Sequence, residues 1–189
     1  MSVVELLHRD SSPPQHFAAI ASAHWLLWPT ACKEDDGCDS ESEVHAKLLR
    51  EHTSATSLPI TLVVTMTDAA DDDDDASSSA ASSSPSSSSS RTSVVCGSVN
   101  LCESDMKGCA MTPWLASLWV SEAQRGKGLS NLLLNEALKY AKDTLGQTKI
   151  YLYVKEGNFA KNLYEEFGFR EVERRDHGGD VVSIMKKEL

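Results

Sequence analysis

Residues 115–134 read LASLWVSEAQRGKGLSNLLL, and this stretch decides the fold. An apolar segment typical of a strand ends at Val120, a short polar turn follows, and residues 125–128 (RGKG) lead into a leucine-rich helical pattern. The first N–H groups of a helix have no intrahelical acceptor and carry partial positive charge, while glycine lets the backbone approach a ligand. The order strand, basic glycine turn and helix therefore predicts a phosphate-binding device.

The composition is that of a soluble globular protein. A chain of 189 residues can bury a sizeable core, and we expect one domain over residues 1–189. Residues 68–92 hold six aspartates and one arginine. They therefore carry a formal charge of −5, which is half of the chain's net charge of −10. The rest is only mildly acidic, so we expect no nucleic-acid partner. The Asp/Ser-rich residues 68–92 predict a disordered loop insertion, with an acidic or phosphorylated tether as the alternative.

The cysteines and the apolar runs bear on the compartment. The five cysteines are odd in number and lack C-x-x-C spacing, so neither a metal site nor a disulfide framework is expected. The N-terminus does not resemble a signal peptide, and no apolar run has the length of a transmembrane helix. We therefore expect a cytoplasmic protein with no membrane partner, with nuclear access left open, as a monomer or a homodimer.

Helix and strand patterns alternate along the chain. Ser12 before two prolines predicts the N-cap of a first helix, and Pro29 predicts the end of that helix. Residues 30–39 are expected to form a loop. Three consecutive strands in the middle exclude a doubly wound dinucleotide fold and predict an α/β or α+β sheet with helices on both faces. The expected strands are 2–7, 58–66, 93–101, 112–120, 149–154, 169–174 and 180–186, and the expected helices are 14–28, 40–51, 128–145 and 158–167.

Two segments resemble signature elements of the GNAT superfamily of acyl-CoA-dependent N-acyltransferases. The acyl-CoA signature is Arg or Gln, two residues, Gly, one residue, then Gly or Ala; residues 125–130 read RGKGLS, so Ser130 departs from the pattern. Residues 158–169 (NFAKNLYEEFGF) match the N-x-A-x-x-L-Y-x-x-x-G-F helix. Asp105 followed by residues 112–117 (TPWLAS) is similar to a subgroup with a TPWLA central strand. The resemblance implies a mostly antiparallel sheet that is splayed in its middle.

The resemblance also implies where acetyl-CoA contacts the chain. The pantetheine is expected on the strand before the turn, with a backbone N–H of that strand polarising the thioester carbonyl, and Asn158 is expected to contact the cofactor. The alternatives are a simple helix N-cap for Asn158 and a solvated glycine turn at the helix start. The residues implied for the strand and for the pyrophosphate turn are Leu118, Trp119, Val120, Arg125, Gly126, Lys127, Gly128, Leu129 and Ser130.

Candidate catalytic groups follow from the same resemblance. Tyr164 matches the position whose phenol lies near the CoA sulfur, which implies a general acid, with a core tyrosine as the alternative. Glu103 and Asp105 follow the strand expected beside the acceptor groove, and either is a candidate base; Asp105 is preferred, and exposed loop carboxylates remain the alternative. The candidates for an aromatic acceptor wall, or else for core positions, are Trp25, Trp28 and Trp114.

These residues lead us to expect an N-acetyltransferase that transfers an acetyl group from acetyl-CoA to a primary amine by direct attack in a ternary complex. A non-catalytic acyl-CoA-binding module that senses or tethers is the alternative. Tyr164 favours the enzyme, because a pure binder has no need of that phenol. The acceptor stays open between a small amine, a lysine side chain and a protein N-terminus.

Overall fold

The computed structural model describes residues 2–34, 36–67 and 93–189, so the predicted insertion at 68–92 lies outside the described residues. Seven strands form one sheet in the order β1-β2-β3-β4-β5-β7-β6. Neighbouring strands are antiparallel except for β4 and β5, which are parallel. The strands are β1 (Ser2–Leu6), β2 (Ile60–Thr67), β3 (Ser93–Cys102), β4 (Trp114–Val120), β5 (Lys149–Lys155), β6 (Arg170–His177) and β7 (Asp180–Glu188).

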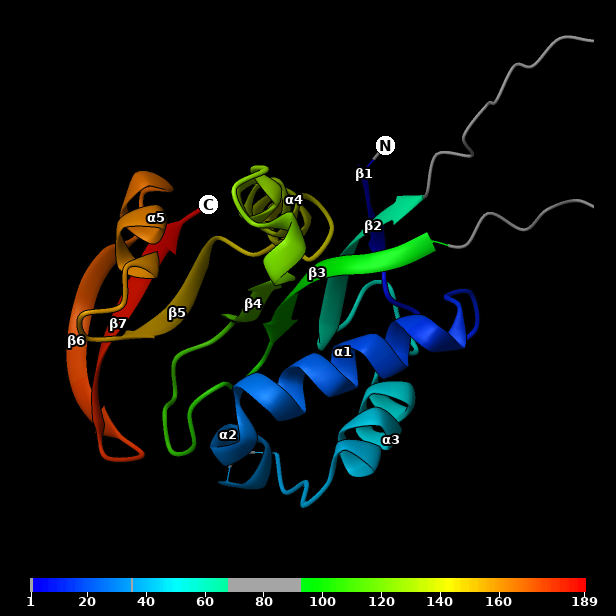
Figure 1. The fold of residues 1–189 in the computed structure, drawn as a ribbon. Coiled ribbons are helices and arrows are strands. Elements are labelled where there is room, and N and C mark those ends of the chain that lie inside the picture. The colour runs from blue at the N-terminus through cyan, green and yellow to red at the C-terminus, as the bar shows by residue number, and fades with distance from the viewer. Residues whose placement is uncertain (1, 35, 68–92) are drawn as a thin grey trace, which may run out of the picture.

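Helices cover both faces of the sheet, which confirms the predicted fold class (Figure 1). Three helices on one face precede β2, and two on the other face follow β4 and β5. In chain order they are α1 (Pro14–Leu27), α2 (Pro29–Glu34), α3 (Glu41–Glu51), α4 (Leu129–Asp143) and α5 (Ala160–Glu166), with a 3₁₀ turn, η1 (Glu122–Gln124), before α4. No helix of the described residues combines the length and the apolar character needed to cross a membrane.

The alternation of side chains along β2 divides the core into two layers. Leu62 and Val64 pack in the cluster that includes the apolar face of α4, while Val63 between them packs in the cluster that includes α1. In the first cluster Leu133 and Leu134 of α4 are fully buried. Burying each such side chain contributes roughly 1.5–3 kcal/mol. This packing fixes α4, and with it the position of the glycine turn that precedes it.

Two local predictions near α1 are wrong. Pro29 does end α1, but it also opens α2, which takes up half of the predicted loop at residues 30–39; a proline fits the first turn of a helix because its missing N–H would have no acceptor there. Ser12 is not the N-cap of α1, because Pro13 holds that position without a side-chain cap. The Ser12 hydroxyl instead donates to the Leu6 carbonyl at 3.2 Å and accepts from the His8 N–H at 3.0 Å.

The sheet is open in its middle, between β4 and β5. Their only register partners are Trp114 and Tyr151, at the start of β4 and near the middle of β5. Beyond this point the two parallel strands diverge. On its other edge β4 pairs with β3 through a bulge, where Ser117 adopts a left-handed φ of 51°. The later residues of β4 therefore border an opening on one side and a bulged ladder on the other.

Candidate functional site

The turn between β4 and α4 is built by two glycines in left-handed conformations. Gly126 has φ 77° and Gly128, the N-cap residue of α4, has φ 76°. Residues with a Cβ rarely adopt such angles, which explains glycine at both positions. A Cβ added at either glycine would meet nothing within 4 Å, so the turn presents an open backbone surface.

The start of α4 offers backbone donors to a ligand. The first α-helical hydrogen bond runs from the Leu132 N–H to the Gly128 carbonyl at 3.1 Å, so the N–H groups of residues 129–131 have no intrahelical acceptor. Among the described residues, the N–H groups of residues 126–128 find no backbone acceptor either. Six consecutive N–H groups at a helix N-terminus suit the oxygens of a diphosphate.

The two basic side chains of the turn are held close to it. The Arg125 Nε donates to the Val120 carbonyl at 3.3 Å, and its guanidinium lies 3.5 Å from the Glu122 carboxylate. The Lys127 ammonium donates to the Gln124 side chain at 2.7 Å. Both side chains are exposed, so they can neutralise the charge of an anion on the backbone of the turn.

The strand residues predicted for pantetheine lie at the opening. Leu118 packs against the cluster below α4, whereas Trp119 packs against the cluster around α1. Val120 is buried in the first of these clusters. Towards β5 this half of β4 has no strand partner, which leaves backbone groups for an extended amide-bearing ligand.

Tyr164 of α5 reaches the same cluster as Leu118 and packs edge-on against Phe169, with ring centroids 6.0 Å apart. Burial, and then the charge of Asp105, raises the pKa of the Tyr164 phenol to about 12. The phenol is therefore protonated at neutral pH, as a proton donor must be.

Asp105 and Glu103 lie in the segment between β3 and β4, and only Asp105 is half-buried. Its charge acts on the Tyr164 phenol and also raises the pKa of the Cys102 thiol, for which burial is the larger cause. The structure thus brings Asp105 and Tyr164 within electrostatic range of each other. Glu103 is exposed, and the structure shows no comparable link between it and Tyr164.

The other predicted residues are placed less favourably. Asn158 is exposed, and its side chain accepts from the Ala160 N–H at 2.9 Å, but Phe159 and not Asn158 holds the N-cap position of α5. Trp114 is fully buried and donates to the Met111 carbonyl, so it occupies a core position and offers no surface to an acceptor. Trp25 lies under the Lys33 ammonium, 5.6 Å from its ring centre. Trp28 packs edge-on against His24.

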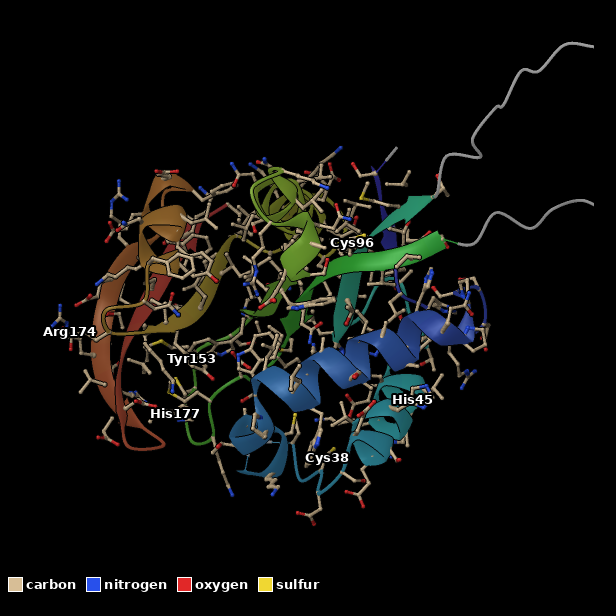
Figure 2. The ribbon with its side chains drawn as sticks, in the orientation of Figure 1. Cys38, His45, Cys96, Tyr153, Arg174 and His177 are labelled. Carbon is tan, nitrogen blue, oxygen red and sulfur yellow. The ribbon has the colours of Figure 1, made fainter. Side chains whose placement is uncertain are left out.

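Sequence reasoning missed two aromatic neighbours on the side of the sheet away from α5. Tyr153 of β5 contacts the Trp114 ring at 6.3 Å and the His177 ring at 5.2 Å between centroids, and Figure 2 shows Tyr153 and His177 side by side. His177 ends β6 at the hairpin turn formed by Gly178 and Gly179. No signal in the sequence pairs a β5 tyrosine with this hairpin.

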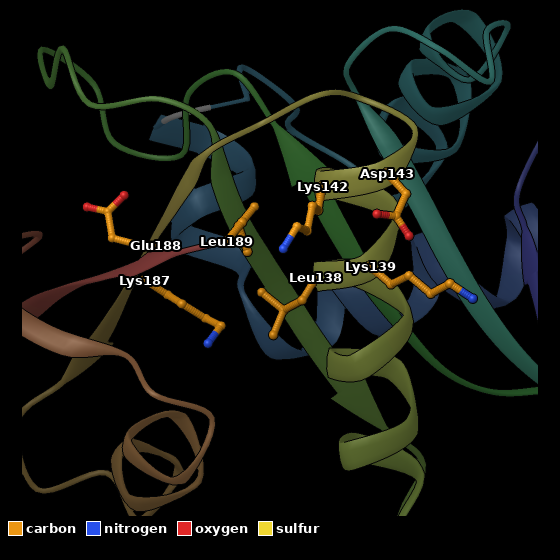
Figure 3. Close-up of a pocket in the computed structure, with 7 residues that line it drawn as sticks. All are labelled: Leu138, Lys139, Lys142, Asp143, Lys187, Glu188 and Leu189. Atoms are coloured by element: carbon orange, nitrogen blue, oxygen red, sulfur yellow. The ribbon is translucent and has the colours of Figure 1, made fainter.

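A separate hollow of about 310 Å³ lies at the other end of α4 (Figure 3). It is lined by the last turns of α4 and the end of β7, with Lys139, Lys142 and Lys187 among its side chains. Since α4 rises about 1.5 Å per residue, its fifteen residues separate this hollow from the glycine turn. No group of His, Cys, Asp or Glu side chains in the described part of the chain is arranged to hold a metal ion.

Solved structures similar to this chain share its fold. Mutant forms of the spermidine/spermine N-acetyltransferase SpeG from Vibrio cholerae are 20% identical with a TM-score of 0.61, covering 100% of this chain and 95% of that one. A GNAT-family acetyltransferase from Streptococcus pneumoniae is 19% identical with a TM-score of 0.61, covering 100% of both chains. NAA60 from Arabidopsis thaliana is 17% identical with a TM-score of 0.61, covering 100% of this chain and 99% of that one.

No curated protein sequence matches the chain. The model of the acetyltransferase (GNAT) family, in contrast, matches residues 73–169, which is just over half of the chain. That range contains β4, the glycine turn, α4 and the α5 segment with Tyr164. Sequence and fold agree, and the chain belongs to the GNAT acetyltransferase family.

Proposed function

We propose that this acetyltransferase moves an acetyl group from acetyl-CoA to a primary amine by direct attack within a ternary complex. Three features of the structure support the proposal most. They are the open donors at the start of α4, the unpaired half of β4 and the Tyr164 phenol. The first two suit the pyrophosphate and the pantetheine, and the third suits the sulfur end of the same molecule.

The reaction removes one proton from the acceptor nitrogen and adds one proton to the CoA sulfur. The acceptor nitrogen forms a bond to the acetyl carbonyl carbon, the bond from that carbon to the CoA sulfur breaks, and the products are an amide and a thiol. We assign Tyr164 as the donor of the proton to the sulfur, since burial keeps the phenol protonated. Asp105 takes the proton of the amine, directly or through water, with Glu103 as the next candidate. A backbone N–H near Leu118 or Trp119 stabilises charge on the carbonyl oxygen.

A CoA-release assay with a panel of acceptors tests the proposal. The panel contains spermidine, because SpeG proteins of similar fold carry that substrate in their names, a lysine-containing peptide and a peptide with a free N-terminus. Acetyl-CoA binding is measured separately by calorimetry. We expect acetyl-CoA to bind and free thiol to appear with at least one class of acceptor. Binding without release on every acceptor would favour the non-catalytic acyl-CoA-binding module.

The role of Tyr164 is tested with the variant Tyr164→Phe. We expect its acetyl-CoA affinity to persist while turnover falls by about 100-fold, the lower range of general acid catalysis. Tyr140→Phe is the matched control, because that hydroxyl donates to the Ala55 carbonyl on the other side of α4 and has no place in the reaction. Equal turnover in Tyr164→Phe and Tyr140→Phe would remove Tyr164 from the mechanism.

A further inference from the structure

Strand β6 carries a bulge that changes the direction of its charged side chains. Glu171 is opposite Met185 and Glu173 is opposite Ile184, so Val172 is an additional residue in β6. In a regular strand, residues three apart point to opposite faces. The additional residue brings Glu171 and Arg174 to the same face, where the Arg174 Nε donates to Glu171 Oε1 at 2.7 Å.

Glu171 accepts bonds from three elements of the fold. Its Oε2 accepts from the Lys161 ammonium of α5 at 2.5 Å and from the Ser183 hydroxyl of β7 at 2.9 Å. Ser183 is buried, and its oxygen also accepts from the Lys161 ammonium at 3.2 Å. The bonds from Arg174, then Lys161 and Ser183, lower the pKa of Glu171 to about 2. The carboxylate is therefore charged wherever the protein is expected to be folded.

The same network reaches the turn before α5. The second nitrogen of the Arg174 guanidinium donates to Glu156 Oε1 at 3.1 Å, and Glu156 directly follows β5. Figure 2 shows Arg174 on β6, the strand at the edge of the sheet. Glu171 and Arg174 thus connect β6 both to the turn that holds Asn158 and to the first turn of α5. A helix of seven residues is too short to be stable alone, so its position depends on such contacts.

Tyr164 lies three residues after Lys161, on the adjoining turn of the same side of α5. We infer that Glu171 is a positioning residue of the active site: through Lys161 and Arg174 it holds α5 so that the Tyr164 phenol stays at the opening between β4 and β5. This inference rests on the role proposed for Tyr164. Glu171 touches no reacting atom and acts through the helix that it holds.

The chain offers a matched control on the opposite face of β6. Glu173 pairs with Arg175 of its own strand at 2.5 Å and has no bond to α5. Its side chain is 35% exposed, against 29% for Glu171. The substitutions Glu171→Gln and Glu173→Gln therefore remove the same charge from nearby positions of one strand, and only the first removes a charge that is bonded to α5.

The first experiment compares steady-state kinetics of these variants. We expect Glu171→Gln and Lys161→Met each to lower kcat by about tenfold, within the range that displacement of a catalytic group produces, with KM for acetyl-CoA unchanged. Glu173→Gln should retain the wild-type kcat, and Lys161→Arg should restore most of the loss seen in Lys161→Met. A wild-type kcat in Glu171→Gln, or an equal loss in Glu173→Gln, overturns the inference.

The second experiment asks whether Glu171 acts through Tyr164. In a Tyr164→Phe background we expect Glu171→Gln to cause no further loss of kcat, because the group that it positions is gone. A further tenfold loss would mean that Glu171 acts by another route, and would overturn the inference while leaving the proposed function in place.

Hydrogen exchange tests the positioning without turnover. The N–H groups of Phe167, Gly168 and Phe169 bond to carbonyls at the end of α5, so their exchange reports the stability of this helix. We expect faster exchange in Glu171→Gln and not in Glu173→Gln, whichever acceptor the enzyme uses. Unchanged exchange in Glu171→Gln overturns the inference. Failure of every acceptor in the CoA-release assay, in contrast, contradicts only the proposed function.

Discussion

Gly97 lies on β3 opposite Val120, next to the bulge between β3 and β4. A Cβ at this position would lie 2.5 Å from the Trp119 carbonyl oxygen and 3.2 Å from the Leu133 and Val64 side chains. The oxygen belongs to the backbone, so it cannot move aside without shifting β4. We expect Gly97→Ala to lower the free energy of unfolding by about 1–3 kcal/mol, the usual cost of overpacking. Urea-induced unfolding measures this change.

The adjacent Ser98 provides the control. Ser98 is fully buried, and in the described part of the chain its hydroxyl has no hydrogen-bond partner. Removing an unsatisfied buried hydroxyl costs little or is favourable, so Ser98→Ala should unfold at the wild-type urea concentration or above it. If Gly97→Ala also kept the wild-type midpoint, the close approach of β3 and β4 would not be a constraint on this residue.

Helix α4 has a left-handed glycine at each end, and only one of them belongs to the candidate site. Gly128 and Gly146 have φ 76° and 63°, and a Cβ at either would meet nothing within 4 Å. Alanine in this conformation costs roughly 1–2 kcal/mol of backbone strain at both positions. We expect Gly128→Ala to weaken acetyl-CoA binding, measured by calorimetry, by about tenfold as the turn moves its N–H groups off the ligand. Gly146→Ala should lose similar stability without weakening binding.

Wild-type acetyl-CoA affinity in both Gly128→Ala and Gly146→Ala would argue against a pyrophosphate site at the turn. An equal loss in both would mean that the effect on Gly128 is only a loss of folding stability. The comparison therefore separates the two functions of the first turn of α4, which are to begin a helix and to present donors.

The elements were predictable where the local pattern was strong. The leucine pattern after residue 128 needs one buried face, and the apolar run at 60–64 is typical of a strand buried on both faces; tertiary packing provides both. The helix at Pro29–Glu34 was missed because its six residues carry no amphipathic repeat. The bulge at Val172 was also missed, since the additional residue is apparent only when β6 is paired with β7.

The candidate site was predictable only where its residues are contiguous in the sequence. The turn at residues 125–130 is contiguous, so its motif and its geometry coincide. The electrostatic link between Asp105 and Tyr164 joins residues far apart in the chain, and the burial of Trp114 depends on Tyr151 and Tyr153 of another strand. Such contacts are set by the order of strands in the sheet, which local periodicity does not encode.

At the scale of the whole molecule, the layer between α1, α3 and the sheet contains buried histidines. His24 is 7% exposed, and burial lowers its pKa to about 4; the charge of Asp36 raises this pKa, while His52 and Lys47 lower it further. Burial likewise lowers the pKa of His52, whose ring bonds to the Leu48 carbonyl and the Thr61 hydroxyl. Both imidazoles are therefore neutral in the folded protein at neutral pH, and protonating either one disfavours the folded state.

Because this layer contains buried neutral histidines, we expect the protein to lose stability in mild acid. His24 has an ordinary pKa of 6.5 in the unfolded chain and about 4 in the folded protein, so its stabilising effect is complete above pH 6.5 and is lost as the pH falls towards 4. We expect about 2 kcal/mol of unfolding free energy to be lost from this residue between pH 7 and pH 5. In urea titrations His24→Gln should flatten the dependence of stability on pH, because glutamine does not titrate. Ile20→Val, a core variant of the same helix, should lower stability at every pH and keep the wild-type slope. A slope in His24→Gln as steep as in Ile20→Val would place the acid sensitivity outside this layer.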